Sequence, residues 1–143
     1  MLGMQAQGIL AALGPRTGDG GQDVATVLVV EDDPLIAQLL GVMLRDDFRL
    51  IVAGTGKEAL EMARAERPSA ITLDLMLPDV HGQEVLAGLK ADPATADIPV
   101  IIVSAYTRSL RELDRKQVVR VVAKPFSPIE LLEAVRDVVT DAA

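Results

Sequence analysis

The sequence predicts an α/β fold in which helices cover both faces of one open, five-stranded parallel sheet. Two patterns lead to this prediction. Short aliphatic runs alternate five times with segments of helical periodicity, and the connections between them are short. Runs of four or five β-branched or aliphatic residues are typical of central parallel strands, which are buried on both sides.

Each expected element is marked by its own residues. The expected strands are Val24–Val30, Arg49–Ala53, Ala70–Leu73, Val100–Ser104 and Val118–Ala123. The expected helices are Leu35–Arg45, Gly56–Ala65, His81–Lys90, Leu110–Gln117 and Pro128–Val139. Asp33 is a capping acid before Pro34, and Thr55 and Ser127 each precede a glutamate by three residues, the spacing of a capping box. The third and fourth helices have weaker signals, because the third contains two glycines and the fourth is short and strongly charged.

Composition narrows the class of protein. The chain has 143 residues, enough for one domain with a real core, and 50% of them are hydrophobic. The net charge of −7 argues against a generic nucleic-acid or anionic-membrane binder, which would need a basic surface. The sequence has no cysteine and no apolar stretch near the roughly 20 residues of a membrane span. We therefore expect a cytoplasmic protein that contacts neither nucleic acid nor membrane directly.

Residues 1–23 differ from the rest and are expected to form an N-terminal extension and linker, followed by a single domain over residues 24–143. A glycine-rich stretch at 14–21 has the composition of a linker. Before it, an apolar residue recurs at helical spacing, at Leu2, Ala6, Ile9 and Leu13. Gly3 and Gly8 would weaken such a helix by about 1 kcal/mol each. Two interpretations therefore stay open: a frayed tail, or a short helix that docks or dimerises.

Polar residues stand at the end of four of the aliphatic runs. Glu31 and Asp32 follow the first strand, Asp74 follows the third, Ser104 ends the fourth and Lys124 follows the fifth. The carboxyl ends of parallel strands share one edge of a sheet, where ligands bind in open α/β folds. We therefore expect these five side chains to meet in one crevice.

The polar groups in this crevice predict phosphoryl chemistry. Carboxylates that lie close together repel one another, and Mg²⁺ (or Mn²⁺) would relieve that repulsion at Glu31, Asp32 and Asp74. Asp74, alone at the end of its strand, is the expected nucleophile that forms an acyl phosphate. Ser104 would donate a hydrogen bond to the phosphoryl group, and Lys124 would hold another of its oxygens as a point charge.

Four motifs together resemble a known family. They are Val27–Pro34 (VLVVEDDP), Leu73–Pro78 (LDLMLP), Val103–Ala105 (VSA) and Ala123–Phe126 (AKPF). In this order and spacing they resemble the receiver domain of bacterial two-component response regulators, over roughly residues 24 to 140. The resemblance implies a flavodoxin-like, doubly wound sheet of order 2-1-3-4-5. It also implies that Asp74 is phosphorylated from a partner's phosphohistidine, that the backbone carbonyl of Met76 is a metal ligand, and that the Lys124–Pro125 bond is cis.

The sequence departs from the family pattern near the last strand. The family usually has an aromatic residue three positions before the lysine, where this chain has Val121. Lys116-Gln117-Val118 replaces a frequent Ala-Gly-Ala pattern, and Tyr106, the only tyrosine, lies where the family varies. The segment from Ser104 to Lys124 is a residue or two short, which predicts a small fourth helix. The resemblance thus implies a complete phosphorylation site beside an altered output face.

Other residues are assigned structural roles. Asp33 is expected to cap its helix, and His81 to begin a helix or lie in a loop without a part in the chemistry. Three methionines are expected to fill the core: Met43, Met62 and Met76. The charges between Arg111 and Lys116 are expected to form a solvated face, which can also be a partner surface.

These features predict a stand-alone receiver, a signalling switch that is not an enzyme beyond its own phosphoryl transfer and dephosphorylation. A histidine kinase or histidine phosphotransfer protein would phosphorylate it, and its output would be protein–protein contact, including a homodimer. The alternative is a phosphorylation-independent adaptor or dimerisation module with the same fold, which the altered region 116–121 favours. A separate phosphatase or phosphotransferase is not expected, because the sequence lacks an Asp-x-Asp nucleophile motif and a glycine-rich phosphate loop.

Overall fold

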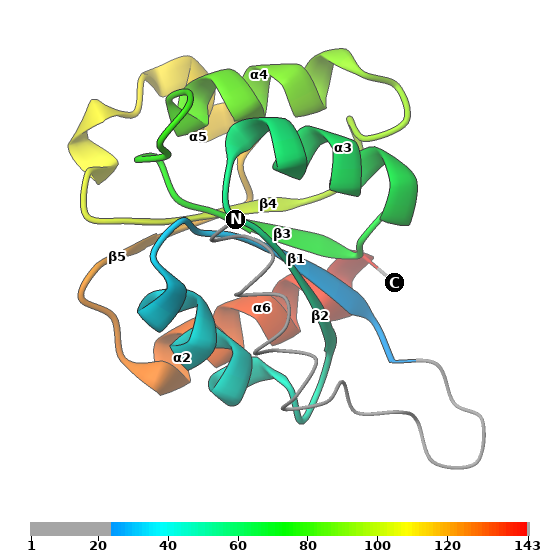
Figure 1. Cartoon of the computed structure of the whole chain (residues 1–143), viewed down its shortest axis with the longest axis vertical. Helices are drawn as coiled ribbons and strands as arrows, with labels where there is room; N and C mark the ends of the chain where they lie inside the picture. Colours follow the sequence, from blue (N-terminus) through cyan, green and yellow to red (C-terminus); the bar gives the residue numbers. More distant parts are fainter. Residues whose placement is uncertain (1–23, 143) are drawn as a thin grey trace.

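The structure of the chain is a computed structural model that describes residues 24–142. Its five strands are β1 (Thr26–Val30), β2 (Arg49–Ala53), β3 (Ala70–Leu73), β4 (Val100–Ser104) and β5 (Arg120–Ala123). They form one parallel sheet of order β2-β1-β3-β4-β5 (Figure 1), which confirms the predicted order. The expected N-terminal extension, with its stripe from Leu2 to Leu13, lies outside the described residues.

Helices cover both faces of the sheet, as predicted. They are α2 (Pro34–Leu44), α3 (Gly56–Glu66), α4 (Gly82–Ala91), α5 (Glu112–Gln117) and α6 (Pro128–Ala142), with a short 3-10 turn, η2 (Thr107–Ser109). Helices α2 and α6 lie on one face, and α3, α4 and α5 lie on the other (Figure 1). The fold is therefore doubly wound.

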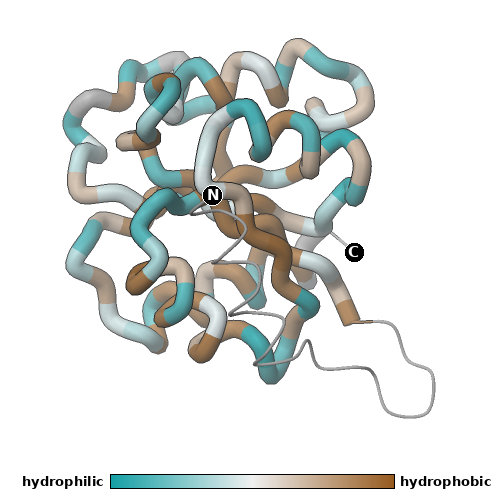
Figure 2. The backbone as a smooth tube through the Cα atoms, viewed as in Figure 1, coloured by the Kyte–Doolittle hydropathy of each residue, from teal (hydrophilic) through white to brown (hydrophobic). Residues whose placement is uncertain are grey.

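The core divides into two aliphatic clusters, one on each side of the sheet. Alternate residues of β1 point to opposite sides: Val27 and Val29 pack in the cluster with α2 and α6, whereas Leu28 and Val30 pack in the cluster with α3 and α4. Figure 2 shows the most hydrophobic residues concentrated in the central strands. Burial on both faces explains why these strands appear in the sequence as continuous aliphatic runs.

Some element boundaries differ from the predicted ones. Strands β1 and β5 begin at Thr26 and Arg120 instead of Val24 and Val118, and α6 continues to Ala142. Helix α5 begins at Glu112 instead of Leu110, because Leu110 and Arg111 both have an extended backbone after η2. The resulting helix has only six residues, as the short segment before Lys124 predicted.

The predicted helix starts are confirmed where the structure describes their hydrogen bonds. Asp33 Oδ1 accepts a bond of 2.9 Å from the backbone N–H of Leu35. The Thr55 hydroxyl accepts a bond of 3.1 Å from Glu58 N–H, and Ser127 Oγ accepts the equivalent bond at the start of α6. His81 is the N-cap residue of α4, and its side chain makes no capping hydrogen bond.

One structural assignment made from the sequence is wrong. Met76 does not fill the core, since it lies in the loop after β3 with 47% of its surface exposed, although Met43 and Met62 do pack against the core. The charged segment around α5 is largely solvated, as predicted, with the side chains of Arg111, Glu112 and Lys116 at 74%, 86% and 72% exposure. Asp114 departs from this pattern, since it is only 3% exposed and pairs with Arg111. In the part of the chain that the structure describes, we find no helix of the length and apolarity needed to span a membrane.

Candidate functional site

The carboxyl ends of the central strands bring together the polar residues that the sequence singled out. Asp74 N–H donates to the carbonyl of Val30 across 3.1 Å, and Lys124 N–H donates to the carbonyl of Ser104 across 3.0 Å. These bonds continue the sheet pairing one residue past the strands. The positions of Asp74 and Lys124 are therefore fixed by backbone hydrogen bonds in addition to the contacts of their side chains.

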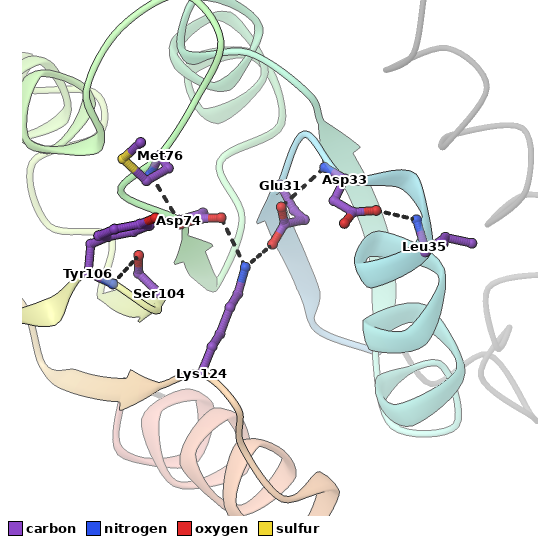
Figure 3. A network of polar contacts seen from close by, with 8 residues as sticks. All are labelled: Glu31, Asp33, Leu35, Asp74, Met76, Ser104, Tyr106 and Lys124. Carbon is purple, nitrogen blue, oxygen red and sulfur yellow. Dashed lines mark hydrogen bonds and ion pairs between the residues drawn. The ribbon is translucent and has the colours of Figure 1, made fainter.

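Lys124 is the cation at the centre of the site (Figure 3). Its Nζ lies 2.6 Å from Glu31 Oε1 and 2.9 Å from Asp74 Oδ2. The Lys124 side chain is 15% exposed, so the ion pairs are largely removed from solvent. The following peptide bond, Lys124–Pro125, is cis, as the resemblance implied.

Backbone N–H groups fix the remaining carboxylate oxygens. Asp74 Oδ1 accepts a bond of 3.1 Å from the N–H of Met76, and Glu31 Oε2 accepts one of 3.2 Å from the N–H of Asp33 (Figure 3). Lys124 and these N–H groups therefore hold both carboxylates in place.

Burial and charge work against each other at Glu31 and Lys124. Burial raises the pKa of Glu31 to about 7, with a contribution from the charge of Asp74, although the bond from Lys124 opposes the change. Burial also disfavours the charged form of Lys124, but its bonds to the two carboxylates outweigh this effect and raise its pKa. When ionised, the three acids Glu31, Asp32 and Asp74 together carry more negative charge than the one ammonium group of Lys124 neutralises.

The acids fit a small divalent cation. Carboxylate oxygens of Glu31, Asp32 and Asp74 all lie within 4.8 Å of one another. They are hard oxygen donors, which Mg²⁺ prefers, and the excess negative charge is the charge that such a cation would neutralise. The participation of the Met76 carbonyl stays a prediction.

Ser104 and Tyr106 form the other side of the site. Ser104 is fully buried at the end of β4, next to the strand that leads to Asp74, and its Oγ accepts a bond of 3.2 Å from the N–H of Tyr106. Tyr106 is 57% exposed. Val121, which replaces the aromatic residue of the family pattern, is partly buried against the cluster on the α3 and α4 side.

Sequence reasoning missed the role of Gly82 in positioning the loop that follows β3 and carries Asp74. Its N–H donates to the carbonyl of Leu75 across 2.8 Å. A Cβ at position 82 would lie 2.5 Å from the carbonyl oxygen of Asp74 and 2.6 Å from the Cα of Leu75. Only a residue without a side chain fits there, whereas the sequence showed Gly82 only as a weak point in a helix.

Asp79 was also missed, and it ties the same loop to α3. Its carboxylate accepts bonds of 2.8 Å from Gly56 N–H and 3.1 Å from Lys57 N–H. The bond from Gly56 is the main cause of the lowered pKa of Asp79. Helix starts attract acids, but the sequence has no local signal that links position 79 to a helix more than twenty residues earlier.

Comparisons with known proteins agree with this geometry. The family model described as the response regulator receiver domain matches residues 27–136 of this chain. The DNA-binding response regulator MtrA of Mycolicibacterium smegmatis is 38% identical over 119 residues, which cover 77% of this chain and 48% of that protein. An uncharacterised 14.6 kDa protein of Leptolyngbya boryana is 34% identical, with 77% of this chain and 86% of that protein covered. The match thus spans about half the length of MtrA.

A solved structure provides a comparison in three dimensions. The receiver domain of a sensor histidine kinase from Pseudomonas aeruginosa PAO1 matches with a TM-score of 0.75 and 26% identity, over 82% of this chain and 99% of that one. That structure has a magnesium ion coordinated in its active-site cleft.

The family match covers all the residues of the crevice and all of the sheet except Thr26. The strand order, the acids after β1 and β3, and the lysine after β5 are also those of the resemblance noted in the sequence. The chain therefore belongs to the family of response regulator receiver domains, the phosphorylation-based signalling modules of two-component systems.

Proposed function

We propose that Asp74 accepts a phosphoryl group from a histidine kinase or histidine phosphotransfer protein, and that the phosphorylated chain signals through protein–protein contact. An Asp74 carboxylate oxygen would form a bond to phosphorus as the bond from phosphorus to the donor's histidine nitrogen breaks. The electron pair of that bond leaves with the imidazole. The observation that carries the proposal is the fixed Asp74 carboxylate, with Lys124 Nζ at 2.9 Å and other acids within 4.8 Å.

The neighbouring residues have distinct proposed roles. Glu31, Asp32 and Asp74, with the carbonyl of Met76, would hold Mg²⁺, which neutralises charge on the phosphoryl oxygens when bound. Lys124 would bind a phosphoryl oxygen as a point charge. The Ser104 hydroxyl would donate to another oxygen.

Phosphorylation would change the balance of charge in the crevice. It adds about −1.5 to −2 charges at pH 7. Lys124 now divides its bonds between Glu31 and Asp74, so a phosphoryl group on Asp74 would compete for its ammonium group. Ser104 is bonded to the N–H of Tyr106, so a movement of Ser104 would be passed to that exposed residue. The present contacts would be one of the two arrangements that a switch requires, and the phosphorylated chain would adopt the other.

Intact-protein mass measurement with acetyl phosphate and Mg²⁺ tests the proposal. The wild-type chain should gain the mass of one phosphoryl group, and Asp74→Asn should gain none. Asp33→Asn is the matched control, since it changes a nearby acid whose side chain caps α2, and asparagine caps helices equally well. Undiminished labelling of Asp74→Asn at the same site would remove the assignment.

A second candidate function keeps the fold without the phosphate. The chain would then be a phosphorylation-independent adaptor or dimerisation module. The observation in favour of this function is Val121, a small, partly buried residue at the position where the family usually has an aromatic side chain. An unlabelled wild-type chain in the mass experiment, combined with partner binding that Asp74→Asn leaves unchanged, would favour this candidate. We further propose that the receiver domain occupies residues 24–143 and that residues 1–23 are a separate extension.

A further inference from the structure

The loop between β3 and α4 carries two groups that are proposed to bind the cation, the carboxylate of Asp74 and the carbonyl of Met76. Met76 N–H donates to Asp74 Oδ1 across 3.1 Å (Figure 3). Met76 also pairs with His81, at the end of the loop, in an isolated antiparallel bridge. The position of Met76 therefore depends on the return half of the loop, residues 77–81.

Asp79 in this return half binds the start of α3, a different part of the chain. Its Oδ1 accepts a bond of 2.8 Å from Gly56 N–H, and its Oδ2 accepts one of 3.1 Å from Lys57 N–H. The two segments also pack closely. A Cβ at position 56 would collide with a methyl group of Val80 and would lie 3.5 Å from Asp79 Oδ1. Glycine at position 56 therefore lets the loop and the start of the helix lie against each other.

The start of α3 is in turn tied to the acids that follow β1. Glu31 N–H donates to the carbonyl of Ala53, the last residue of β2, across 3.0 Å. Only two residues separate Ala53 from Gly56, where α3 begins. A short path of backbone therefore leads from Glu31 to Asp79 and its loop.

A cation bound in the crevice would need ligands from both ends of this path. Carboxylate oxygens of Glu31, Asp32 and Asp74 lie within 4.8 Å of one another, whereas Asp79 is exposed and lies outside this group. Mg²⁺ requires near-ideal octahedral geometry, with ligands at about 2.0–2.1 Å. A shift of the loop against the acids that follow β1 would therefore lower the affinity for the cation, although no ligand is lost.

The simpler role for Asp79 is to cap α3, but this helix already has a cap of its own. Thr55 Oγ1 accepts a bond of 3.1 Å from Glu58 N–H, within the start of the helix itself. The bonds of Asp79 instead join positions that are 23 and 22 residues apart in the sequence. They therefore hold two separate segments together in addition to completing the start of a helix.

We propose that Asp79 is a positioning residue for the divalent-cation site, because it holds the loop of Met76 against the start of α3. The inference rests on the proposed function, in which Glu31, Asp32, Asp74 and the Met76 carbonyl hold the cation. Asp79 does not bind the cation and takes no part in phosphoryl transfer. It keeps the ligands of two segments at the spacing that the cation needs.

Binding of Mn²⁺ to the unphosphorylated full chain tests this role, with electron paramagnetic resonance as the measure of free Mn²⁺. This cation prefers oxygen ligands, as Mg²⁺ does. Asp79→Ala loses both bonds to α3 and should raise the Mn²⁺ dissociation constant about tenfold, a loss typical of residues that orient metal ligands. Asp79→Asn keeps one acceptor oxygen and should give a smaller increase. An unchanged dissociation constant in Asp79→Ala, or in Asp79→Asn should the alanine variant fail to fold, would overturn the proposal.

Two control variants separate positioning from helix stability and from charge. Thr55→Ala removes the cap that α3 provides for itself, so it weakens the same helix start without releasing the loop. Glu84→Gln removes an exposed acid from the first turn of α4, so it changes the net charge as much as Asp79→Ala does. Both controls should bind Mn²⁺ with the wild-type dissociation constant. An increase in either control as large as that in Asp79→Ala would overturn the positioning role.

Failure of this inference and failure of the proposed function would give different results. A wild-type chain that binds Mn²⁺ no better than Asp79→Ala does would remove the positioning role and leave the cation site in place. A wild-type chain that binds no Mn²⁺ would remove the proposed cation site, and the role of Asp79 with it.

Discussion

Two buried carboxylates in this protein each face a cation, but their pKa values move in opposite directions. Asp114 and Glu31 are both 3% exposed. The hydrogen bond from the Arg111 side chain lowers the pKa of Asp114, whereas burial raises the pKa of Glu31 to about 7 despite its bond to Lys124. Burial alone therefore does not decide the charge of a carboxylate here.

The difference lies first in desolvation, which is the largest influence on the pKa of Glu31 but is outweighed at Asp114 by the hydrogen bond from Arg111, and second in how each cation is shared. The Arg111 side chain is 74% exposed and serves Asp114 alone, with the N–H of Arg111 as an added donor. The Lys124 side chain is 15% exposed and divides its bonds between Glu31 and Asp74. At α5, one carboxylate pairs with one cation, and their charges balance. In the crevice, one cation is shared by two carboxylates, so negative charge remains. Such an excess of negative charge is expected of a site that binds a cation.

The largest difference between the two pairs should appear when each cation is removed. Lys124→Met leaves two buried carboxylates unpaired and should lower the free energy of unfolding by about 3 kcal/mol. Arg111→Met removes an exposed, solvent-screened partner and should cost clearly less. Urea denaturation measures both, and added Mg²⁺ should restore part of the loss in Lys124→Met only. Equal costs for the two variants would refute the contrast.

Replacement of Asp114, the carboxylate that pairs with Arg111, should have the next largest effect. Asp114→Ala loses the bonds to the Arg111 backbone and side chain that fix the start of α5, so it should cost about 2 kcal/mol. Asp137→Ala is the control, because its pair with Arg120 at 3.4 Å is exposed, and it should cost no more than about 0.5 kcal/mol. Thermal or urea unfolding of both variants provides the comparison.

The two carboxylates should also give opposite pH dependence. Glu31 has a folded pKa of about 7 against an ordinary value of 4.5, so between these pH values the native state binds more protons than the unfolded state. Its contribution to stability is therefore lost as the pH rises from 4.5 through 7, with a slope of at most about 1.4 kcal/mol per pH unit. Asp114 has a pKa below its ordinary value of 3.8, so its ionised form stabilises the native state. This contribution is lost as the pH falls below 3.8.

Urea titrations in a chelator, at a series of pH values, measure these slopes. Glu31→Gln should remove the slope between pH 4.5 and 7 and keep the acid limb, whereas Asp114→Asn should weaken the acid limb alone. A Glu31→Gln variant with the wild-type slope would show that another group titrates in this window.

The sequence was sufficient to predict those features that depend on local pattern. Aliphatic runs predicted the strands, and the topology of parallel strands brought Glu31, Asp74 and Lys124 to one edge. The burial of Asp114 and the close approach of Gly82 to Asp74 were not predictable in this way, because both arise where separate segments pack. The outer face of α2 was hidden for a related reason: the helix is apolar on most sides, so its periodicity could not reveal which residues remain exposed.

Thr72 extends the comparison to a buried polar group without any partner among the described residues. It is 1% exposed in the middle of β3, and its Oγ1 makes no hydrogen bond there. Thr72→Val replaces the hydroxyl with a methyl group of similar shape and should raise the free energy of unfolding by up to about 1 kcal/mol.

Thr95 provides the matched control for this smallest effect. It is equally buried, 2% exposed, but its Oγ1 donates to the carbonyl of Leu89 across 2.7 Å. Thr95→Val should therefore destabilise the protein by about 1 kcal/mol, because the carbonyl loses its donor. Opposite signs for the two substitutions would establish that the partners of a buried polar group decide its energy in this fold, as they do for the two carboxylates. The same sign for both would instead mean that the change in packing outweighs the hydrogen bond.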